Sequence, residues 1–174
     1  MFKFAENAMP HRIPRQPLTT IRRATRHDLD SMVHLLQMLF TIEASFEPAP
    51  ERQRAGLKQM LRHPRQSCIM VAETIMPPPT PPRIIGMCTG QLVTSTAQGT
   101  QSLWIEDLII ESAWRNHGYG RQLLEAIISW GKGEGATRAQ LLAENANLSA
   151  INFYTYLGWE RTDLNCWRKM LCSS

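Results

Sequence analysis

The alternation of apolar and polar positions along the chain predicts short strands separated by amphipathic helices. Apolar residues at helical spacing follow Thr25 and continue to about Ala44, with Thr25 or Asp28 as the helix cap. Further helices are predicted over residues 51–61, 121–130 and 149–157. Branched and aromatic runs predict strands at residues 19–24, 67–73, 83–94, 103–110 and 137–143, and a final hairpin of residues 159–161 and 166–170. The pattern therefore predicts an α/β (α+β) fold.

The segment 103–133 joins a strand to a helix through a glycine-containing turn. The strand, residues 103–110, is apolar apart from two acids in its middle, and the helix that follows has one apolar face. Between them lies the sequence Arg115-Asn116-His117-Gly118-Tyr119-Gly120. Such a turn collects unpaired N–H groups at the positive end of a helix dipole, and its glycines let the backbone approach a ligand closely. We predict a pyrophosphate-binding turn, although it is neither a P-loop nor a dinucleotide-binding G-x-G-x-x-G motif.

The two acids in the central strand are Glu106 and Asp107. Charged groups rarely lie in a buried strand unless they have a partner or a chemical role. Strand alternation sends neighbouring side chains to opposite faces, so we expect only one of the two to reach a substrate. A kink at this point would exchange the faces, which keeps both acids as candidates.

Composition and charge exclude several classes of protein. We expect residues 1–18 to form an extended or disordered lead-in and residues 19–174 to form one domain. The net charge is +4, but the basic residues are spread singly, which argues against a nucleic-acid partner. No apolar run reaches the roughly 18–20 residues that span a membrane, and the N-terminus lacks the apolar core of a secretory signal. We therefore expect no membrane partner and a cytoplasmic location.

The cysteines and histidines show no metal-ligand pattern. The four cysteines contain no C-x-x-C pair and the five histidines no i, i+4 pair, so we expect reduced thiols and no metal. The segment 76–82, MPPPTPP, lies between two predicted strands. Its prolines exclude regular structure and predict a stiff, exposed hairpin loop, with a proline-rich ligand for a partner protein as the alternative.

Two sequence motifs together resemble those of the GNAT N-acetyltransferase superfamily. The turn matches [Q/R]-x-x-G-x-[G/A] through Arg115, Gly118 and Gly120. A second string matches N-x-x-A-x-x-F-Y-x-x-x-G-[F/W] through Asn147, Ala150, Phe153, Tyr154, Gly158 and Trp159. Within the superfamily the chain is most similar in motif to the polyamine (spermidine/spermine-type) branch and its bacterial relatives. The resemblance implies a GNAT fold, with a mixed central sheet of about six to seven strands and about four flanking helices. It also implies that the central strand is parallel to the strand after it.

The resemblance implies an acetyl-CoA-dependent N-acetyltransferase in which the amine attacks directly within a ternary complex. Tyr154 would be the general acid for the coenzyme A sulfur, and Glu106 the general base, acting through water, with Asp107 as the alternative base. The residues expected to bind the coenzyme are Leu108, Ile109 and Ile110 through their backbone, then Arg115, Asn116, His117, Gly118, Tyr119, Gly120 and Arg121 at the pyrophosphate, and Asn147 and Tyr154. Asn147 has a second interpretation as a helix cap, and Arg115 has one as a brace of the turn.

The expected acceptor is a primary amine of a small molecule, bound near the first two helices and the loop between them. That segment carries Glu43, Glu47 and Glu51, which form either an acidic patch for a cationic amine or a solvated helix end. Two alternatives remain open: acetylation of a protein lysine or N-terminus, and an acyl-CoA sensor without catalysis. A homodimer is expected by analogy with the family.

Overall fold

A five-stranded sheet with helices on both faces forms the centre of the computed structural model, which describes residues 18–42, 47–75 and 79–171. The elements are β1 (Leu18–Arg23), α1 (Leu29–Ile42), α2 (Pro50–Arg62), β2 (Ser67–Ile75), β3 (Arg83–Ser95), β4 (Thr100–Ile110), α3 (Tyr119–Gly133), β5 (Ala136–Leu141) and α4 (Leu148–Tyr156), with short 3-10 turns η1 (Arg26–Asp28) and η2 (Ser112–Trp114). The predicted elements up to α4 are present, with ends displaced by a few residues. Ala44, Glu43 and nearly all of the predicted lead-in lie outside the described residues.

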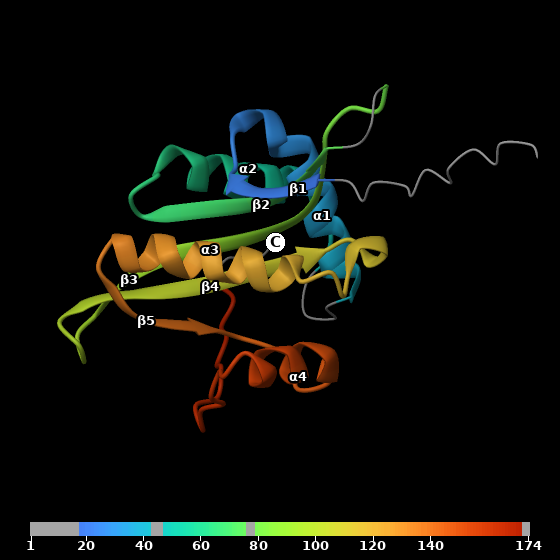
Figure 1. Ribbon diagram of the computed structural model, residues 1–174. Helices are drawn as coiled ribbons and strands as arrows, with labels where there is room; N and C mark the ends of the chain where they lie inside the picture. Colours follow the sequence, from blue (N-terminus) through green and yellow to red (C-terminus); the bar gives the residue numbers. More distant parts are fainter. Residues whose placement is uncertain (1–17, 43–46, 76–78, 172–174) are drawn as a thin grey trace, which may run out of the picture.

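The strands lie in the order β1-β2-β3-β4-β5 (Figure 1). Neighbours pair antiparallel except β4 and β5, which are parallel as expected. The described residues form five strands, slightly fewer than the expected count of about six to seven. Residues 159–171 form no strand among the described residues, so the predicted final hairpin is absent. These residues have the pattern from which strands were predicted. A strand also needs a neighbouring strand for its hydrogen bonds, and a local pattern does not show whether one is present.

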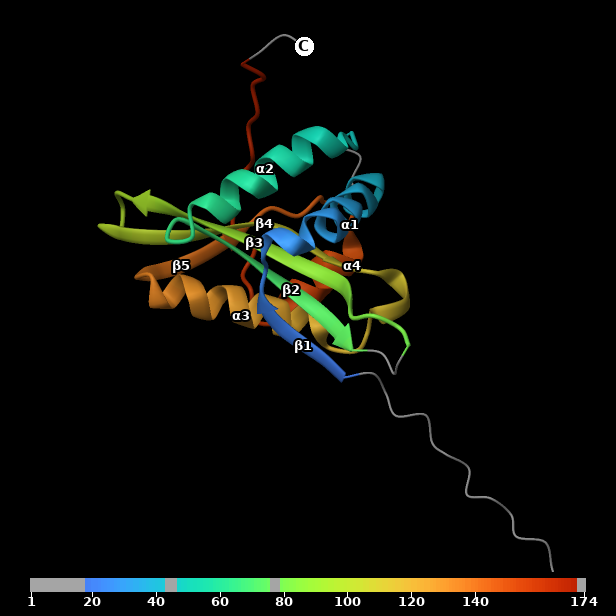
Figure 2. The same ribbon diagram turned by 90° about the horizontal axis from the view of Figure 1, so that it is seen from above.

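Helices α1 and α2 cover one face of the sheet, and α3 lies on the other (Figure 2). Residues such as Met32 and Leu35 of α1 and Leu57 of α2 are buried against Val71 and Met87 of the sheet. On the opposite face, the apolar stripe predicted for α3 is buried, and α4 adds partly buried aromatic rings to the same cluster. Close packing of α3 requires a small residue at Gly90, where an added Cβ would lie 2.8 Å from Cγ1 of Ile127.

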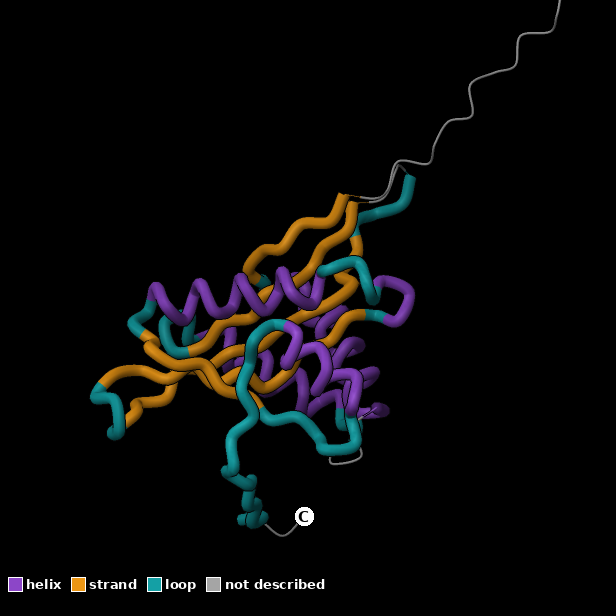
Figure 3. The backbone as a smooth tube through the Cα atoms, turned by 60° about the horizontal axis from the view of Figure 1, so that its bottom comes forward, coloured by secondary structure: helices purple, strands orange, loops and turns teal. Residues whose placement is uncertain are grey.

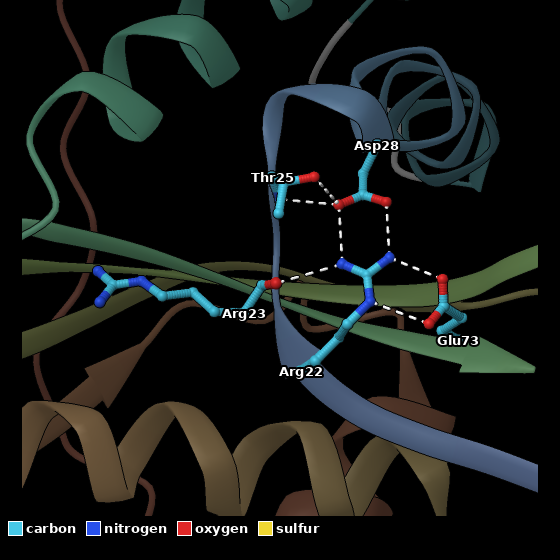
Figure 4. Close-up of polar contacts among 5 residues, drawn as sticks. All are labelled: Arg22, Arg23, Thr25, Asp28 and Glu73. Carbon is cyan, nitrogen blue, oxygen red and sulfur yellow. Dashed lines mark hydrogen bonds and ion pairs between the residues drawn. The ribbon is translucent and has the colours of Figure 1, made fainter.

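A partly buried ion-pair cluster joins the start of α1 to the sheet (Figure 4). Arg22 of β1 donates hydrogen bonds of 2.8–2.9 Å to both carboxylate oxygens of Asp28 and of 2.8–3.0 Å to both oxygens of Glu73 on β2. Asp28 also accepts the N–H of Thr25 at 2.7 Å, and Thr25, one of the two expected caps, is the N-cap residue of this turn. The Arg22 guanidinium lowers the pKa of Asp28 to about 2 and that of Glu73 below its usual value. The cluster thereby orients α1 over the sheet.

The proline-containing loop joins β2 to β3, which pair antiparallel. Its described residues, 79–82, are exposed and contain no strand, as predicted for a hairpin loop. Residues 76–78 of the predicted segment lie outside the described residues.

Candidate active site

A β-bulge in the middle of the sheet places Glu106 and Asp107 together opposite Thr89. The β3–β4 register pairs Cys88 with Leu108 but Gly90 with Ile105, so two residues of β4 face one residue of β3. Thr89 closes the bulge with two hydrogen bonds to Asp107. Its Oγ1 donates to the carboxylate at 2.7 Å and accepts the backbone N–H at 3.0 Å.

The bulge reverses the facing of the strand beyond it. Ile105 packs in the α3 cluster, whereas Ile109, four residues later, packs in the α1–α2 cluster. Strict alternation would place both on one face. The expectation that Glu106 and Asp107 point to opposite faces was therefore wrong, because the extra residue brings them to the same side.

Both acids line an open pocket of about 420 Å³ between α1, α2 and strands β3 and β4. Gln91 of β3 donates to a carboxylate oxygen of Glu106 at 3.3 Å, a long hydrogen bond that leaves this acid exposed. The remaining walls combine apolar and neutral polar side chains: Leu36, Phe40, Gln53, Gly56, Leu57, Gln59, Met60, His63, Gln66, Ser67 and Leu92. No Lys or Arg occurs among the described residues that line it, so the acids give the pocket a negative character. The volume suits a small molecule.

The acidic patch expected beside the second helix is not part of this pocket. Glu47 and Glu51 are exposed, and neither lines it. For these two described residues the structure favours the solvated helix end, while Glu43 lies outside the described residues.

Strands β4 and β5 separate at the level of the bulge. Their pairing runs from Gln101 with Ala136 to Ile105 with Leu141, where β5 ends, while β4 continues to Ile110. The edge of β4 from Leu108 to Ile110 therefore has no β5 residue paired with it among the described residues. Figure 1 shows the two strands diverging towards the start of α3 and α4. An extended ligand can pair with such an edge.

The predicted turn leads from β4 into α3 with two residues in the left-handed region, Asn116 (φ 64°) and Gly118 (φ 82°). Arg115 braces the turn, since its Nε donates to the Ile110 carbonyl at 3.1 Å. The imidazole Nδ1 of His117 lies 2.7 Å from the Arg115 carbonyl. Gly118 is the N-cap residue of α3, a fifteen-residue helix, so the first backbone N–H groups of this helix are available to an anion.

The space beside this turn fits a phosphate group. An added Cβ at Gly118 would meet only the Gln122 amide, at 3.9 Å, so the glycine leaves open room where the backbone faces outward. Arg121 is exposed in the first turn of α3 and pairs with Glu125 at 2.7 Å. The Glu125 carboxylate raises the pKa of Arg121.

Helix α4 brings Phe153, the neighbour of Tyr154, close to the start of α3. The ring of Phe153 lies 3.6 Å from the position of an added Cβ on Gly120, so the two motifs are in contact. Tyr154 is half-buried, with its ring centroid 5.3 Å from that of Phe153 and 5.8 Å from that of Trp159. Asn147 is the N-cap residue of α4, and its Oδ1 accepts the Ala150 N–H at 3.0 Å. The helix-cap interpretation of Asn147 is therefore confirmed. A contact between its side-chain NH2 group and the coenzyme stays a prediction.

Sequence reasoning singled out the two acids of the pocket and expected the first two helices beside it, but it missed Thr89 and Gln91. A threonine or glutamine in a strand carries no local signal for a partner eighteen or fifteen residues away. Within the described residues, no helix combines the length and apolar character needed to cross a membrane. In the same part of the chain, no group of three or more His, Cys, Asp and Glu side chains is arranged to hold a metal ion.

Comparison with solved structures finds the same fold in several acetyltransferases. A structure described as a possible acetyltransferase from Clostridium difficile 630 superposes with a TM-score of 0.76 at 20% identity, covering 90% of this chain and 99% of that chain. The aminoglycoside N-acetyltransferase AAC(6')-Iy gives 0.76 at 17% identity, with 92% and 99% covered. A structure described as a transcriptional regulator from Bacillus halodurans C-125 gives 0.71 at 27% identity, with 88% and 100% covered.

Among curated protein sequences, no match to the chain is found. The model of the acetyltransferase (GNAT) family matches residues 29–159, which include the pocket, the turn and α4. The match spans most of the chain and agrees with the fold, and the protein is therefore an acetyltransferase that belongs to the GNAT family.

Proposed function

We propose that the protein transfers an acetyl group from acetyl-CoA to a primary amine of a small molecule, by direct attack in a ternary complex. The observation that carries the proposal is the bulge, which aims Glu106 and Asp107 into one pocket where β4 leaves β5. An ammonium group is drawn to such a site by the two carboxylates. Two solved neighbours, both AAC(6')-Iy, are described as complexes with CoA and with a bisubstrate analogue, CoA-S-monomethyl-acetylneamine.

The coenzyme binds at a second surface, formed by the open edge of β4 and the turn that follows this strand. The N–H groups at the start of α3, with those of the turn from Arg115 to Arg121, bind the pyrophosphate. The backbone of Leu108, Ile109 and Ile110 pairs with the pantetheine arm at the open edge of β4. The side-chain amide of Asn147 donates to the coenzyme while its Oδ1 caps α4.

Glu106 acts as the general base. The amine arrives as an ammonium ion, and Glu106 accepts its proton through a water molecule before the nitrogen attacks the thioester carbon. Asp107 has a positioning role, because Thr89 holds its carboxylate with a hydrogen bond that strengthens the bulge. As the C–S bond breaks, Tyr154 donates its phenolic proton to the departing thiolate sulfur, and the proton that the acetylated nitrogen then loses restores the phenol.

The two alternatives make different demands on the chain. A protein acetyltransferase would take a peptide along the open pocket beside α2. A sensor would need the phosphate-binding turn but neither Glu106 nor Tyr154. The pocket volume and the pair of acids favour the small cationic amine.

One assay separates these functions: release of free thiol from acetyl-CoA in the presence of polyamines, aminoglycosides, amino acids or peptides. Turnover with small amines supports the proposal. Turnover with peptides alone supports protein acetylation. Binding of CoA without turnover for any acceptor supports the sensor.

The proposal also includes a cytoplasmic location and a homodimer. The described cysteines, Cys68, Cys88 and Cys166, are free thiols, as is usual in a reducing compartment. Burial raises the pKa of Cys68 to about 11, which keeps this thiol unreactive. Exposed apolar side chains near the C-terminus favour an assembly of copies.

A further inference from the structure

One buried polar atom of the pocket has no hydrogen-bond partner within the described residues. Gln53 of α2 lines the pocket, and its side-chain oxygen, Oε1, is buried. No described residue donates a hydrogen bond to this oxygen. An unpaired buried carbonyl lowers the stability of the folded protein. Its presence beside a ligand pocket therefore favours a donor that arrives with the ligand.

The face of α2 that carries Gln53 forms one wall of the pocket. Gln53, Gly56, Leu57 and Met60 line it at the spacing i, i+3, i+4 and i+7 of a single helix face. An added Cβ on Gly56 would meet nothing within 4 Å, so there is open space one turn along the helix from Gln53. A ligand in the pocket therefore has room beside the Gln53 amide.

This wall lies on the other face of the sheet from the turn proposed to bind the coenzyme. Figure 3 shows α3, the long helix that follows the turn, lying across the strands on one face. The pocket is on the other face, where α1 and α2 pack. Gln53 can therefore affect the choice of acceptor without a part in coenzyme binding.

The acidic charge of the pocket is confined to one place. Glu106 and Asp107 are neighbours on β4, and no Lys or Arg lines the described pocket. The other polar side chains of the lining are amides, a hydroxyl and an imidazole: Gln53, Gln59, Gln66, Gln91, Ser67 and His63. A second ammonium group against the amides would lose hydration without a counter-charge, and a carboxylate would be repelled by the two acids. The pocket therefore fits an amine with one positive charge and an uncharged, polar body.

We propose that the acceptor is an amino alcohol, with one amino group and a neutral body that carries a hydroxyl, and that Gln53 selects it by accepting the hydroxyl hydrogen. The inference rests on the proposed function, because it places the amino group beside Glu106. A hydroxyl suits the whole Gln53 side chain, since it can donate to the carbonyl and accept from the NH2 group of the same amide. The apolar walls, which include Leu36 and Leu57, contact the carbon chain between the two groups.

A series of linear amines of equal length tests the class of acceptor. The members end in a hydroxyl, methyl, ammonium or carboxylate group, and the series is repeated at several chain lengths. At the best length, kcat/KM for the amino alcohol should exceed that for each other member by at least roughly tenfold, because only the hydroxyl satisfies the buried carbonyl without adding a charge. Without that preference, this inference fails while the proposed acetyl transfer stands. No turnover of any member overturns both.

Substitutions of Gln53 test whether this residue sets the preference. Gln53→Leu should remove the preference for the amino alcohol over the methyl-ended amine, and it should not lower the melting temperature, because it deletes an unpaired buried carbonyl. Gln53→Glu should shift the preference to the diamine, whose second ammonium group then has a carboxylate partner. The KM of acetyl-CoA should stay unchanged in both variants.

Gln37→Leu is the matched control. Gln37 is a half-buried glutamine of the neighbouring helix α1 and does not line the pocket, so the preference for the amino alcohol should persist in this variant. A preference that survives Gln53→Leu, or one that Gln37→Leu removes equally, overturns the proposed role of Gln53. An unchanged order of acceptors in Gln53→Glu also overturns it.

Discussion

Thr89 and Asp107 share two hydrogen bonds across the bulge between β3 and β4. The threonine hydroxyl donates one of them to the carboxylate of Asp107 and accepts the other from its backbone N–H. This contact holds Asp107 still, while Glu106 beside it has only a 3.3 Å contact with Gln91. The two acids share a pocket but differ in how firmly they are held. On this difference we base the proposal that the exposed acid, Glu106, transfers the proton and that Asp107 maintains the shape of the strand.

Glu106→Gln should therefore lower turnover at pH 7 by roughly 10²–10⁴-fold, the range for a lost general base. The deficit should shrink as pH rises, because more of the amine then arrives neutral. Asp107→Asn should lower the melting temperature and leave the pH dependence of turnover near that of the wild type. Rate against pH for both variants checks the assignment. If Asp107→Asn is folded and inactive while Glu106→Gln is active at pH 7, the base is Asp107.

Tyr154→Phe should lower turnover by a similar factor, because the ring still packs between Phe153 and Trp159 but no proton reaches the thiolate. The thermal shift caused by CoA should persist. Tyr156→Phe on the same helix is the control, since Tyr156 is 81% exposed, and its rate should match the wild type. Equal rates for all three proteins would exclude Tyr154 as the acid.

Gly118→Asn should abolish the stabilisation of the fold by CoA, which binds the native turn and not the unfolded chain. Asparagine tolerates the left-handed backbone that Gly118 adopts, so the added side chain blocks the phosphate with little strain. Gly99→Asn is a matched control, because Gly99 also has a positive φ and open space but lies in the β3–β4 turn. Melting curves with and without CoA give the answer, and an undiminished shift in Gly118→Asn would remove the turn from the site.

Gly56→Leu should narrow the acceptor pocket from the α2 wall. Gly56 lies mid-helix and an added Cβ meets nothing within 4 Å, so the substitution should raise helix stability by up to about 1 kcal/mol. We expect the KM of the amine acceptor to rise by roughly tenfold, equal to about 1.4 kcal/mol. The KM of acetyl-CoA should not change. Ala55→Leu, on the exposed neighbouring position, should alter neither constant, and identical acceptor kinetics in both variants would place the acceptor elsewhere.

Asp28→Asn should destabilise the fold in a pH-dependent way. A pKa lowered from 3.8 to about 2 corresponds to roughly 2 kcal/mol at pH 7. Because the folded-state pKa is depressed, this stabilisation is present above pH 5 and is lost as pH falls towards 2. Urea unfolding should show a difference from wild type at pH 7 that is about half as large at pH 3. Asp30→Asn removes the exposed pair with Arg54 and should change little at either pH, and an equal effect of the two substitutions would contradict the cluster's role.

Local patterns were enough to predict most of the fold and much of the candidate site. The strands and helices up to α4 follow from apolar periodicity. Each element buries one face, and the spacing of its apolar residues along the sequence shows which face this is. The turn from Arg115 to Gly120 was found for the same reason, since a glycine at a left-handed position before a helix is a local requirement. Tyr154 and Asn147 came from a motif on one short helix.

Only the tertiary structure decided how the two acids face and that the described residues 160–171 form no strand. The bulge depends on Thr89, which is eighteen residues from Asp107 in sequence and becomes its partner only when β3 pairs with β4. The pocket forms only where α2 packs beside the bulge, and no short stretch of sequence includes both α2 and the bulge. Residues 166–170 match the pattern of a strand, but a pattern alone cannot provide the neighbouring strand with which to pair. The periodicity of apolar side chains belongs to one segment and can be seen in its sequence. The side to which a residue points, the pairing of strands and the shape of a pocket depend on two or more segments that pack together.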